Sequence, residues 1–153
     1  MKKILLSIAI ALAFASCGAQ KQPVPDDMKP LFPTAESVTV KGNVYTILGH
    51  SGSVEGYAVY SKPASDGIKG FKGETPLLVA FGKDKKVRQV VMLPNQDTPG
   101  FVERVKKGGL PDAWNGLAIK QARSKEVDVV AGATYTSNGV INTMKKTLEN
   151  TKL

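Results

Sequence analysis

The sequence contains only one cysteine and one histidine among its 153 residues. A lone cysteine forms no internal disulfide, and a lone histidine without a neighbouring cysteine or paired carboxylate makes a poor metal site. No apolar run reaches the roughly 18 residues of a membrane-spanning helix. Internal repeats, a Gly-x-Gly-x-x-Gly pattern and a nucleophile–base triad are also missing. These absences argue against a disulfide scaffold, a metal enzyme, a spanning helix and a hydrolase built on a triad.

The composition is that of an ordinary globular protein. The chain is 42% hydrophobic and 22% charged, and it is long enough for one domain with a substantial core. Its net charge of +8 falls to +6 when Lys2 and Lys3 are set aside with the leader described next. Because the basic residues are scattered, we favour a solvated surface over attraction to an anionic membrane or redox partner, and we expect no nucleic-acid partner.

The N-terminus has the features of an export signal. Two lysines precede an apolar stretch at residues 4–14, which is too short to span a membrane and predicts a signal peptide over residues 1–16. Small residues precede Cys17, as in a bacterial lipoprotein, so we expect a lipid on its sulfur. An ordinary signal peptide with a chance cysteine is the alternative. Residues 17–36 are rich in proline and poor in apolar residues, which predicts an extended tether.

Residues 37–153 are expected to form one α+β domain, with a mostly antiparallel sheet and helices packed on it. β-branched and apolar runs predict strands, with hairpin turns at Gly42-Asn43 and at residues 82–86. Apolar residues at helical spacing predict a short helix and a longer C-terminal one. The expected strands are residues 38–48 with a turn inside, 54–61, 76–81, 87–93 and 127–130, and the expected helices begin at Phe101 and near Ser137.

Residues 128–137 carry the clearest chemical pattern. A β-branched run ends at Gly132 and Ala133, and the hydroxyl residues Thr134, Thr136 and Ser137 follow. A strand–turn–helix junction exposes unpaired backbone N–H groups at the positive end of a helix, which suits an anion such as phosphate. The alternative is a simple helix cap after a tight turn, since threonine and serine are ordinary N-cap residues.

The same stretch resembles the flavin-attachment motif of the FMN-binding domain family, which includes flavoprotein subunits of the Rnf electron-transport complex and of sodium-pumping NADH:quinone reductase. The family pattern is Asp, two variable residues, Ser or Thr, Gly, Ala, Ser or Thr, one variable residue and Thr. Ala131 departs from this pattern, because the family usually has a hydroxyl there. The matching residues are Asp128, Gly132, Ala133, Thr134 and Thr136.

A second segment resembles the same family. Its members have a Gly-rich loop with an aromatic residue, a hairpin, and then a turn of an acidic residue, Thr, Pro, Gly and an apolar residue that lines the flavin. Residues 70–73 and 97–101 match the loop and the turn. In the turn, Thr98 offers a hydroxyl, Pro99 stiffens the backbone and Gly100 lets it approach a flat ring. The alternative is a turn that only caps the helix from Phe101.

The resemblance extends over about residues 54–148 and implies a covalent cofactor. It implies FMN joined to Thr136 by a phosphoester bond, which a separate magnesium-dependent flavin transferase makes from FAD. Asp128 would belong to the stretch that this transferase recognises. No catalytic residue or metal ligand is implied. The implied flavin-binding residues are Thr136, Thr134, Ala133, Gly132, Ser137, Thr98, Pro99, Gly100 and Phe101.

We therefore expect an electron carrier rather than a stand-alone enzyme. Relatives in large complexes usually have an N-terminal spanning helix, so a lipid on Cys17 favours a free-standing lipoprotein in the bacterial cell envelope, beside membrane redox partners. Two alternatives stay open: a module that binds FMN or another phosphorylated ligand reversibly, and a small reductase with its own substrate. We interpret Trp114 as a core or lid residue and His50 as a loop residue without a ligand role.

Overall fold

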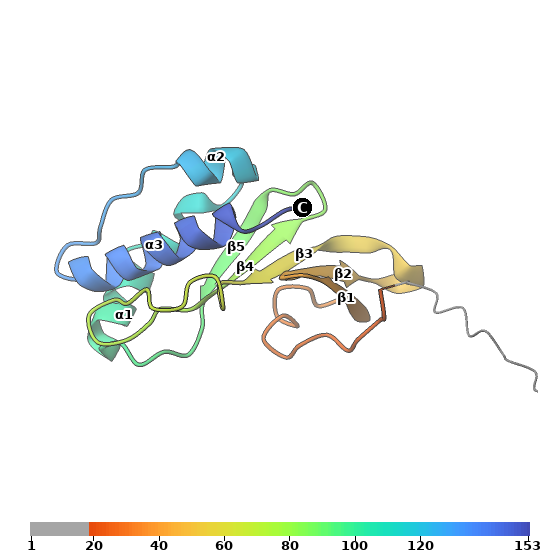
Figure 1. Ribbon diagram of the computed structural model, residues 1–153, viewed down its shortest axis with the longest axis horizontal. Helices are drawn as coiled ribbons and strands as arrows, with labels where there is room; N and C mark the ends of the chain where they lie inside the picture. Colours follow the sequence, from red (N-terminus) through yellow and green to blue (C-terminus); the bar gives the residue numbers. More distant parts are fainter. Residues whose placement is uncertain (1–18) are drawn as a thin grey trace, which may run out of the picture.

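A computed structural model describes residues 19–153, so the expected signal peptide and the lipidation of Cys17 lie outside the described residues. Five strands form one antiparallel sheet in the order β1-β2-β3-β4-β5. Figure 1 shows helices on one side of this sheet and an irregular N-terminal segment near β1 and β2. The elements are β1 (Ser37–Lys41), β2 (Val44–Leu48), η1 (His50–Gly52), β3 (Val54–Tyr60), β4 (Leu77–Gly82), β5 (Val87–Met92), α1 (Pro99–Lys107), η2 (Leu110–Trp114), α2 (Ile119–Ser124) and α3 (Thr134–Glu149).

The strand β4 supplies core residues to both faces of the sheet. Successive side chains of a strand point to opposite faces. Leu77, Val79 and Phe81 therefore pack under the helices, while Leu78 and Ala80 pack on the opposite side. All five side chains are fully buried. This two-sided burial explains the continuous apolar run, and the antiparallel sheet with its helices confirms the predicted α+β class.

The C-terminal helix α3 covers the helical face of the sheet. Its buried residues Val140, Ile141, Met144 and Leu148 recur at helical spacing and join the cluster that contains Val79 and Phe81. Trp114 lies in the same cluster with 1% of its surface exposed. Trp114 is therefore a core residue, in agreement with its interpretation from the sequence as a core or lid residue.

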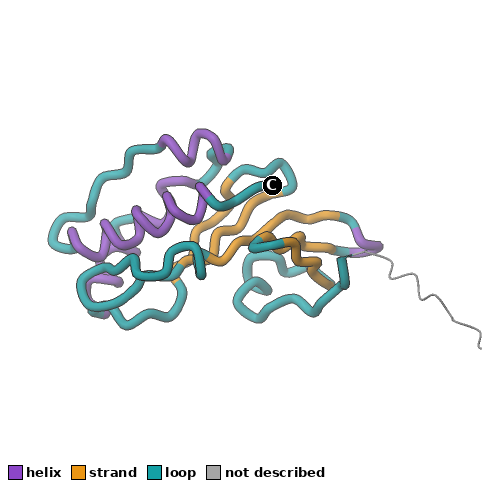
Figure 2. Tube along the Cα trace, viewed as in Figure 1, coloured by secondary structure: helices purple, strands orange, loops and turns teal. Residues whose placement is uncertain are grey.

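Residues 22–36 correct the expectation of an extended tether. Gln22 exchanges two backbone hydrogen bonds of 2.8 Å with Val38 of β1. Val24, Met28 and Phe32 are buried in the second core cluster, against the face of the sheet that the helices leave free. Figure 2 shows this segment as loop folded back against the sheet. The prolines separate turns here, and the few apolar residues between them all reach the sheet.

The expected strand at residues 127–130 is wrong, because this segment pairs with no strand. At the outer edge of β5, the chain beyond η2 pairs with the start of the strand: Val87 N donates to Leu117 O and Gly116 N donates to Val87 O. Without a ladder partner, the β-branched residues stay irregular, and Val129 is 41% exposed. The short helix α2, which the sequence analysis missed, fills the connection before them.

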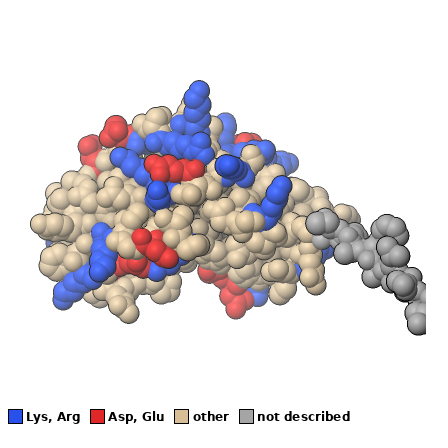
Figure 3. Space-filling view, in the orientation of Figure 1, with Lys and Arg blue, Asp and Glu red and all other residues tan. Residues whose placement is uncertain are grey.

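The described residues offer no candidate for a membrane span or for a metal site. Within residues 19–153, no helix is long and apolar enough to cross a membrane, and no three His, Cys, Asp or Glu residues are grouped to hold a metal ion. His50 is exposed and its Nδ1 lies 3.2 Å from Glu36 Oε1. In Figure 3 basic side chains lie at several places on the visible face, with acidic ones among them.

Candidate functional site

Three segments meet at the buried carboxylate of Asp97, which is 4% exposed. Its Oδ1 accepts hydrogen bonds of 2.8 Å from the backbone N–H groups of Lys72 and Thr98. Its Oδ2 accepts one of 3.0 Å from Phe71 N and one of 2.8 Å from the hydroxyl of Thr136. Asp97 thus joins the loop at residues 70–73, the turn before α1 and the first turn of α3.

The surroundings of Asp97 keep it ionised. Burial by itself raises the pKa of this carboxyl, but the donors at Lys72, Phe71, Thr136 and Thr98 outweigh burial and hold the pKa below its ordinary value. A depressed pKa means that the folded state loses stability only as pH falls below about 4, towards that lowered value. At neutral pH the site therefore holds a fixed negative charge beside the Thr136 hydroxyl.

Glycines allow the loop at residues 70–73 to lie directly on α3. A Cβ on Gly70 would overlap Asp97 Oδ2 and would lie 3.1 Å from Thr136 Cα. A Cβ on Gly139 would lie 2.8 Å from both Cα and N of Gly70. The loop consequently covers Thr136, whose side chain is fully buried.

Replacing Gly139 with alanine is expected to destabilise the protein by about 1–3 kcal/mol, because the added methyl overpacks the contact with Gly70. Alanine in a helix is otherwise favoured over glycine by about 1 kcal/mol. The measurement is the free energy of unfolding in urea. Gly100→Ala in α1 is the control, since its Cβ would meet no atom within 4 Å. Equal stability of the two variants would show that the loop does not press on α3.

The first turn of α3 presents free backbone donors. The helix begins at Thr134, three residues earlier than predicted, and no side chain caps it. Its first hydrogen bond runs from Ser137 N to Ala133 O at 2.9 Å. Gly132 enters the turn with φ +75°, in the left-handed region that favours glycine. A Cβ there would overlap the guanidinium of Arg104, so this exposed cation of α1 stands beside the positive end of α3.

Aromatic side chains wall a cavity of about 250 Å³ at this helix start. The rings of Phe71 and Phe101 meet edge to face with centroids 5.3 Å apart, and the Tyr135 ring centroid lies 6.0 Å from that of Phe71. Phe71 is 50% and Tyr135 68% exposed, which is unusual for large aromatic residues. The lining residues are Phe71, Phe101, Gly132, Ala133, Thr134, Tyr135 and Thr136.

The residues expected from the sequence fall into two groups. Thr136, Thr134, Ala133, Gly132 and Phe101 all line the cavity. The other four expected flavin-binding residues do not: Ser137, Thr98, Pro99 and Gly100. Asp128 is exposed in the segment before α3 and is open to recognition by another protein.

These four residues lie at other places in the structure. Ser137 Oγ is occupied, since it accepts a hydrogen bond of 3.0 Å from Val130 N and holds the irregular segment against α3. Thr98 is the N-cap of α1, and its buried hydroxyl has no partner among the described residues. Pro99 and Gly100 form the first turn of α1 on the protein surface.

Three site residues were absent from the set expected from the sequence: Asp97, Phe71 and Arg104. The acidic position of the turn and the aromatic position of the loop were both recognised as parts of the pattern, which was the available signal for Asp97 and Phe71. Nothing in the sequence marks Arg104, because its approach to Gly132 depends on how α1 and α3 pack.

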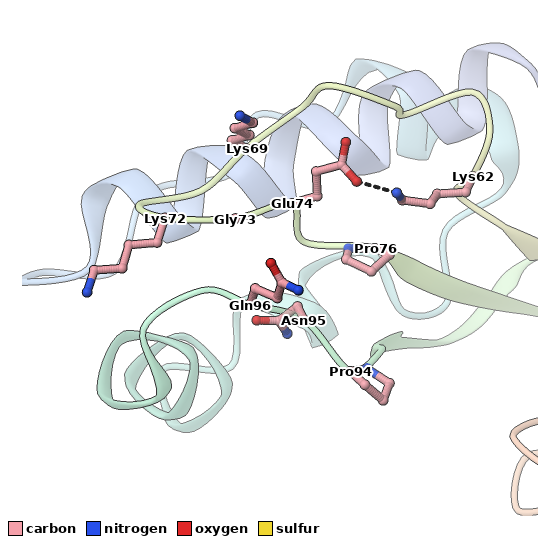
Figure 4. A pocket seen from close by; sticks show the side chains of 9 residues that line it. All are labelled: Lys62, Lys69, Lys72, Gly73, Glu74, Pro76, Pro94, Asn95 and Gln96. Carbon is pink, nitrogen blue, oxygen red and sulfur yellow. Dashed lines mark hydrogen bonds and ion pairs between the residues drawn. The ribbon is translucent and has the colours of Figure 1, made fainter.

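A second cavity, of about 430 Å³, lies on the other side of the same loop. Figure 4 shows residues 69–76 facing Asn95 and Gln96 across it. The ion pair of Lys62 with Glu74 lies at one end, and Glu74 also accepts a hydrogen bond from Gly67 N. The base of the loop is therefore fastened and Gly70 packs on α3, while Phe71 borders one cavity and Lys72 and Gly73 border the other.

Comparison with known proteins agrees with this geometry. A family model described as the FMN-binding domain matches residues 70–149, just over half of the chain, from the Gly-rich loop to the end of α3. The chain belongs to the FMN-binding domain family. The resemblance found in the sequence is thereby confirmed, and FMN is the ligand that the family assigns to this domain.

Two further comparisons add little to this assignment. The domain is similar to the crystal structure of NqrC from Shewanella oneidensis at 21% identity and a TM-score of 0.49, over 91% of this chain and 70% of that one. No curated protein matches the chain.

The residues present fit FMN. The exposed aromatic rings suit a flat ring system, and the uncapped start of α3 with Arg104 suits a phosphate. One feature of the FMN-binding domain needs explanation, namely that the Thr136 hydroxyl is buried and already hydrogen-bonded.

Arg104→Gln is expected to weaken the binding of free FMN about five- to tenfold when measured on a Thr136→Ala background, which prevents attachment. The magnitude reflects one exposed charge-assisted contact to the phosphate, screened by solvent. Quenching of flavin fluorescence measures the affinity. Riboflavin, which lacks the phosphate, is the control ligand. An equal loss for FMN and riboflavin would mean that Arg104 supports the fold rather than the phosphate.

Proposed function

We propose that this protein is a membrane-tethered electron-transfer flavoprotein that carries FMN esterified to Thr136. The observation that carries the proposal is the contact of Thr136 with Asp97, since it joins the two segments in which the sequence resembles the family. FMN accepts and donates one or two electrons, and its protein orients it and adjusts its potential. Phe71, Phe101 and Tyr135 would hold the ring, and the start of α3 with Arg104 would hold the phosphate.

A covalent bond would retain a cofactor that this site binds only weakly. A helix N-terminus stabilises an exposed anion by only about 1 kcal/mol, which does not retain a free cofactor in a dilute extracytoplasmic space. Among the described residues, no group of side chains could hold a metal ion with which the domain would catalyse formation of this bond by itself. We therefore assign the bond to a magnesium-dependent flavin transferase with FAD as donor, which would recognise the exposed Asp128.

The lipid anchor would hold the domain closer to the membrane than the sequence suggested. Gln22 is already paired with Val38, and it lies only five positions after Cys17. An extended chain of that length reaches about 17 Å. A lipid on Cys17 would thus keep the flavoprotein beside membrane redox partners in the cell envelope without a long swinging arm.

The burial of Thr136 supports a second candidate, a module that holds FMN reversibly. A denaturing gel separates the two. The protein is produced with and without a flavin transferase, denatured and examined for flavin fluorescence. Covalent attachment predicts a fluorescent band only when the transferase is present. Reversible binding predicts dark bands in both lanes, with flavin bound to the native protein that dialysis removes.

A further inference from the structure

The Thr136 hydroxyl bonds to a residue outside its own helix. Two other threonines of this region bond back along the chain: Thr147 donates to Thr143 O and Thr151, just after α3, donates to Thr147 O, both at 2.7 Å. Thr136 instead donates to Asp97 Oδ2 at 2.8 Å, across 39 positions of sequence. The carboxylate therefore decides where this hydroxyl proton points and leaves the oxygen lone pairs free.

We propose that Asp97 is a catalytic residue of the flavin-attachment step, because it accepts the Thr136 proton as the phosphoester bond forms. This inference rests on the proposed function. In the step, Thr136 Oγ attacks the FMN-side phosphorus of FAD, the P–O bond of the anhydride breaks, and AMP leaves. The hydroxyl proton passes to Asp97 and then to solvent, and no group is oxidised or reduced. The domain would thus bring a base to its own modification.

The chemistry matches what carboxylates do elsewhere. In phosphoryl transfer to a hydroxyl, an aspartate held against the acceptor commonly takes its proton. Asp97 is ionised and touches the reacting oxygen, so both requirements are present before a transferase arrives.

The loop at residues 70–73 controls both the access of FAD to the Thr136 hydroxyl and the basicity of the Asp97 carboxylate. It covers Thr136, and its N–H groups at Phe71 and Lys72 lower the pKa of Asp97. FAD reaches the hydroxyl only when this loop lifts, for which the cavities on both of its sides leave room. Lifting removes two of the four donors to Asp97, so the carboxylate becomes a stronger base in the open, reactive state.

The test measures attachment rates by mass spectrometry on the full chain in detergent, with a flavin transferase, magnesium and FAD. Asp97→Asn is expected to lower kcat for attachment at least about 100-fold, the usual contribution of a general base, with the KM for the acceptor protein unchanged. Asp112→Asn is the matched control, because it removes an exposed carboxylate in η2 and should react like the wild type. Circular dichroism confirms folding of each variant.

The outcomes separate the inference from the proposed function. A wild-type rate for folded Asp97→Asn, or a loss that appears only in KM, would overturn the role of Asp97 and leave covalent FMN intact. No attachment to the wild type would overturn both. If Asp97→Asn does not fold, Asp97→Glu and Asp97→Gln replace it: labelling of the Glu variant alone supports the proposal, and equal labelling overturns it.

Discussion

A Thr136→Ala protein is expected to carry no covalent flavin at all. Coexpressed with a flavin transferase and run on a denaturing gel, it should give a dark band beside a fluorescent wild-type band. The loss is complete because the substitution removes the only oxygen that the proposed phosphoester bond uses. It leaves the fold largely intact, since the lost hydroxyl makes one hydrogen bond, to a carboxylate that keeps its three backbone donors.

Thr134→Ala is the matched control for this experiment. Thr134 lies two residues earlier in the same helix turn, lines the same cavity and is exposed. Its variant keeps the Thr136 oxygen and should therefore still give a fluorescent band, with a lower yield because Thr134 also lines the cavity. A dark Thr134 variant beside a bright Thr136 variant would move the attachment to Thr134. A dark wild-type band beside a dark Thr136→Ala band would indicate that Ala131 prevents recognition of the motif by the transferase or that FMN is held reversibly.

Phe32→Ala is expected to lower the free energy of unfolding by about 3–5 kcal/mol, as for other buried aromatic residues. Phe32 is 2% exposed in the cluster on the second face of the sheet. It fills the space opposite Gly56 of β3, where a Cβ would lie 2.8 Å from Phe32 Cε1. Urea denaturation followed by circular dichroism measures the loss.

Phe71→Ala controls for the removal of a phenyl ring. Because Phe71 is half exposed, its replacement should lower the free energy of unfolding by less than about 1 kcal/mol. If residues 22–36 were a tether, Phe32→Ala would behave like Phe71→Ala. The expected difference would instead show that the domain begins near Gln22 and includes a segment that the sequence analysis left outside it.

The sequence by itself predicted much of the fold and several residues of the site. The β-branched and apolar runs, with the turns at Gly42-Asn43 and residues 82–86, placed the hairpins correctly, because strand pairing between sequence neighbours depends on local geometry. The spacing of Val140, Ile141, Met144 and Leu148 identified the buried face of α3 for the same reason. Thr136 and Phe101 were found through a motif of fixed spacing, and they do line one cavity.

The tertiary structure decided what depends on contacts between distant segments. The β-branched residues 127–130 had the propensity of a strand, but they pair with no strand, and residues 116–118 pair with Lys86 and Val87 at the start of β5. Proline-rich residues 22–36 had the composition of a linker, yet their few apolar side chains join the core cluster on the second face of the sheet. In both cases burial and available partners outweighed local preference. The same holds for the site, where Asp97 meets Thr136 and Arg104 meets Gly132 only because α1, α3 and the covering loop pack together.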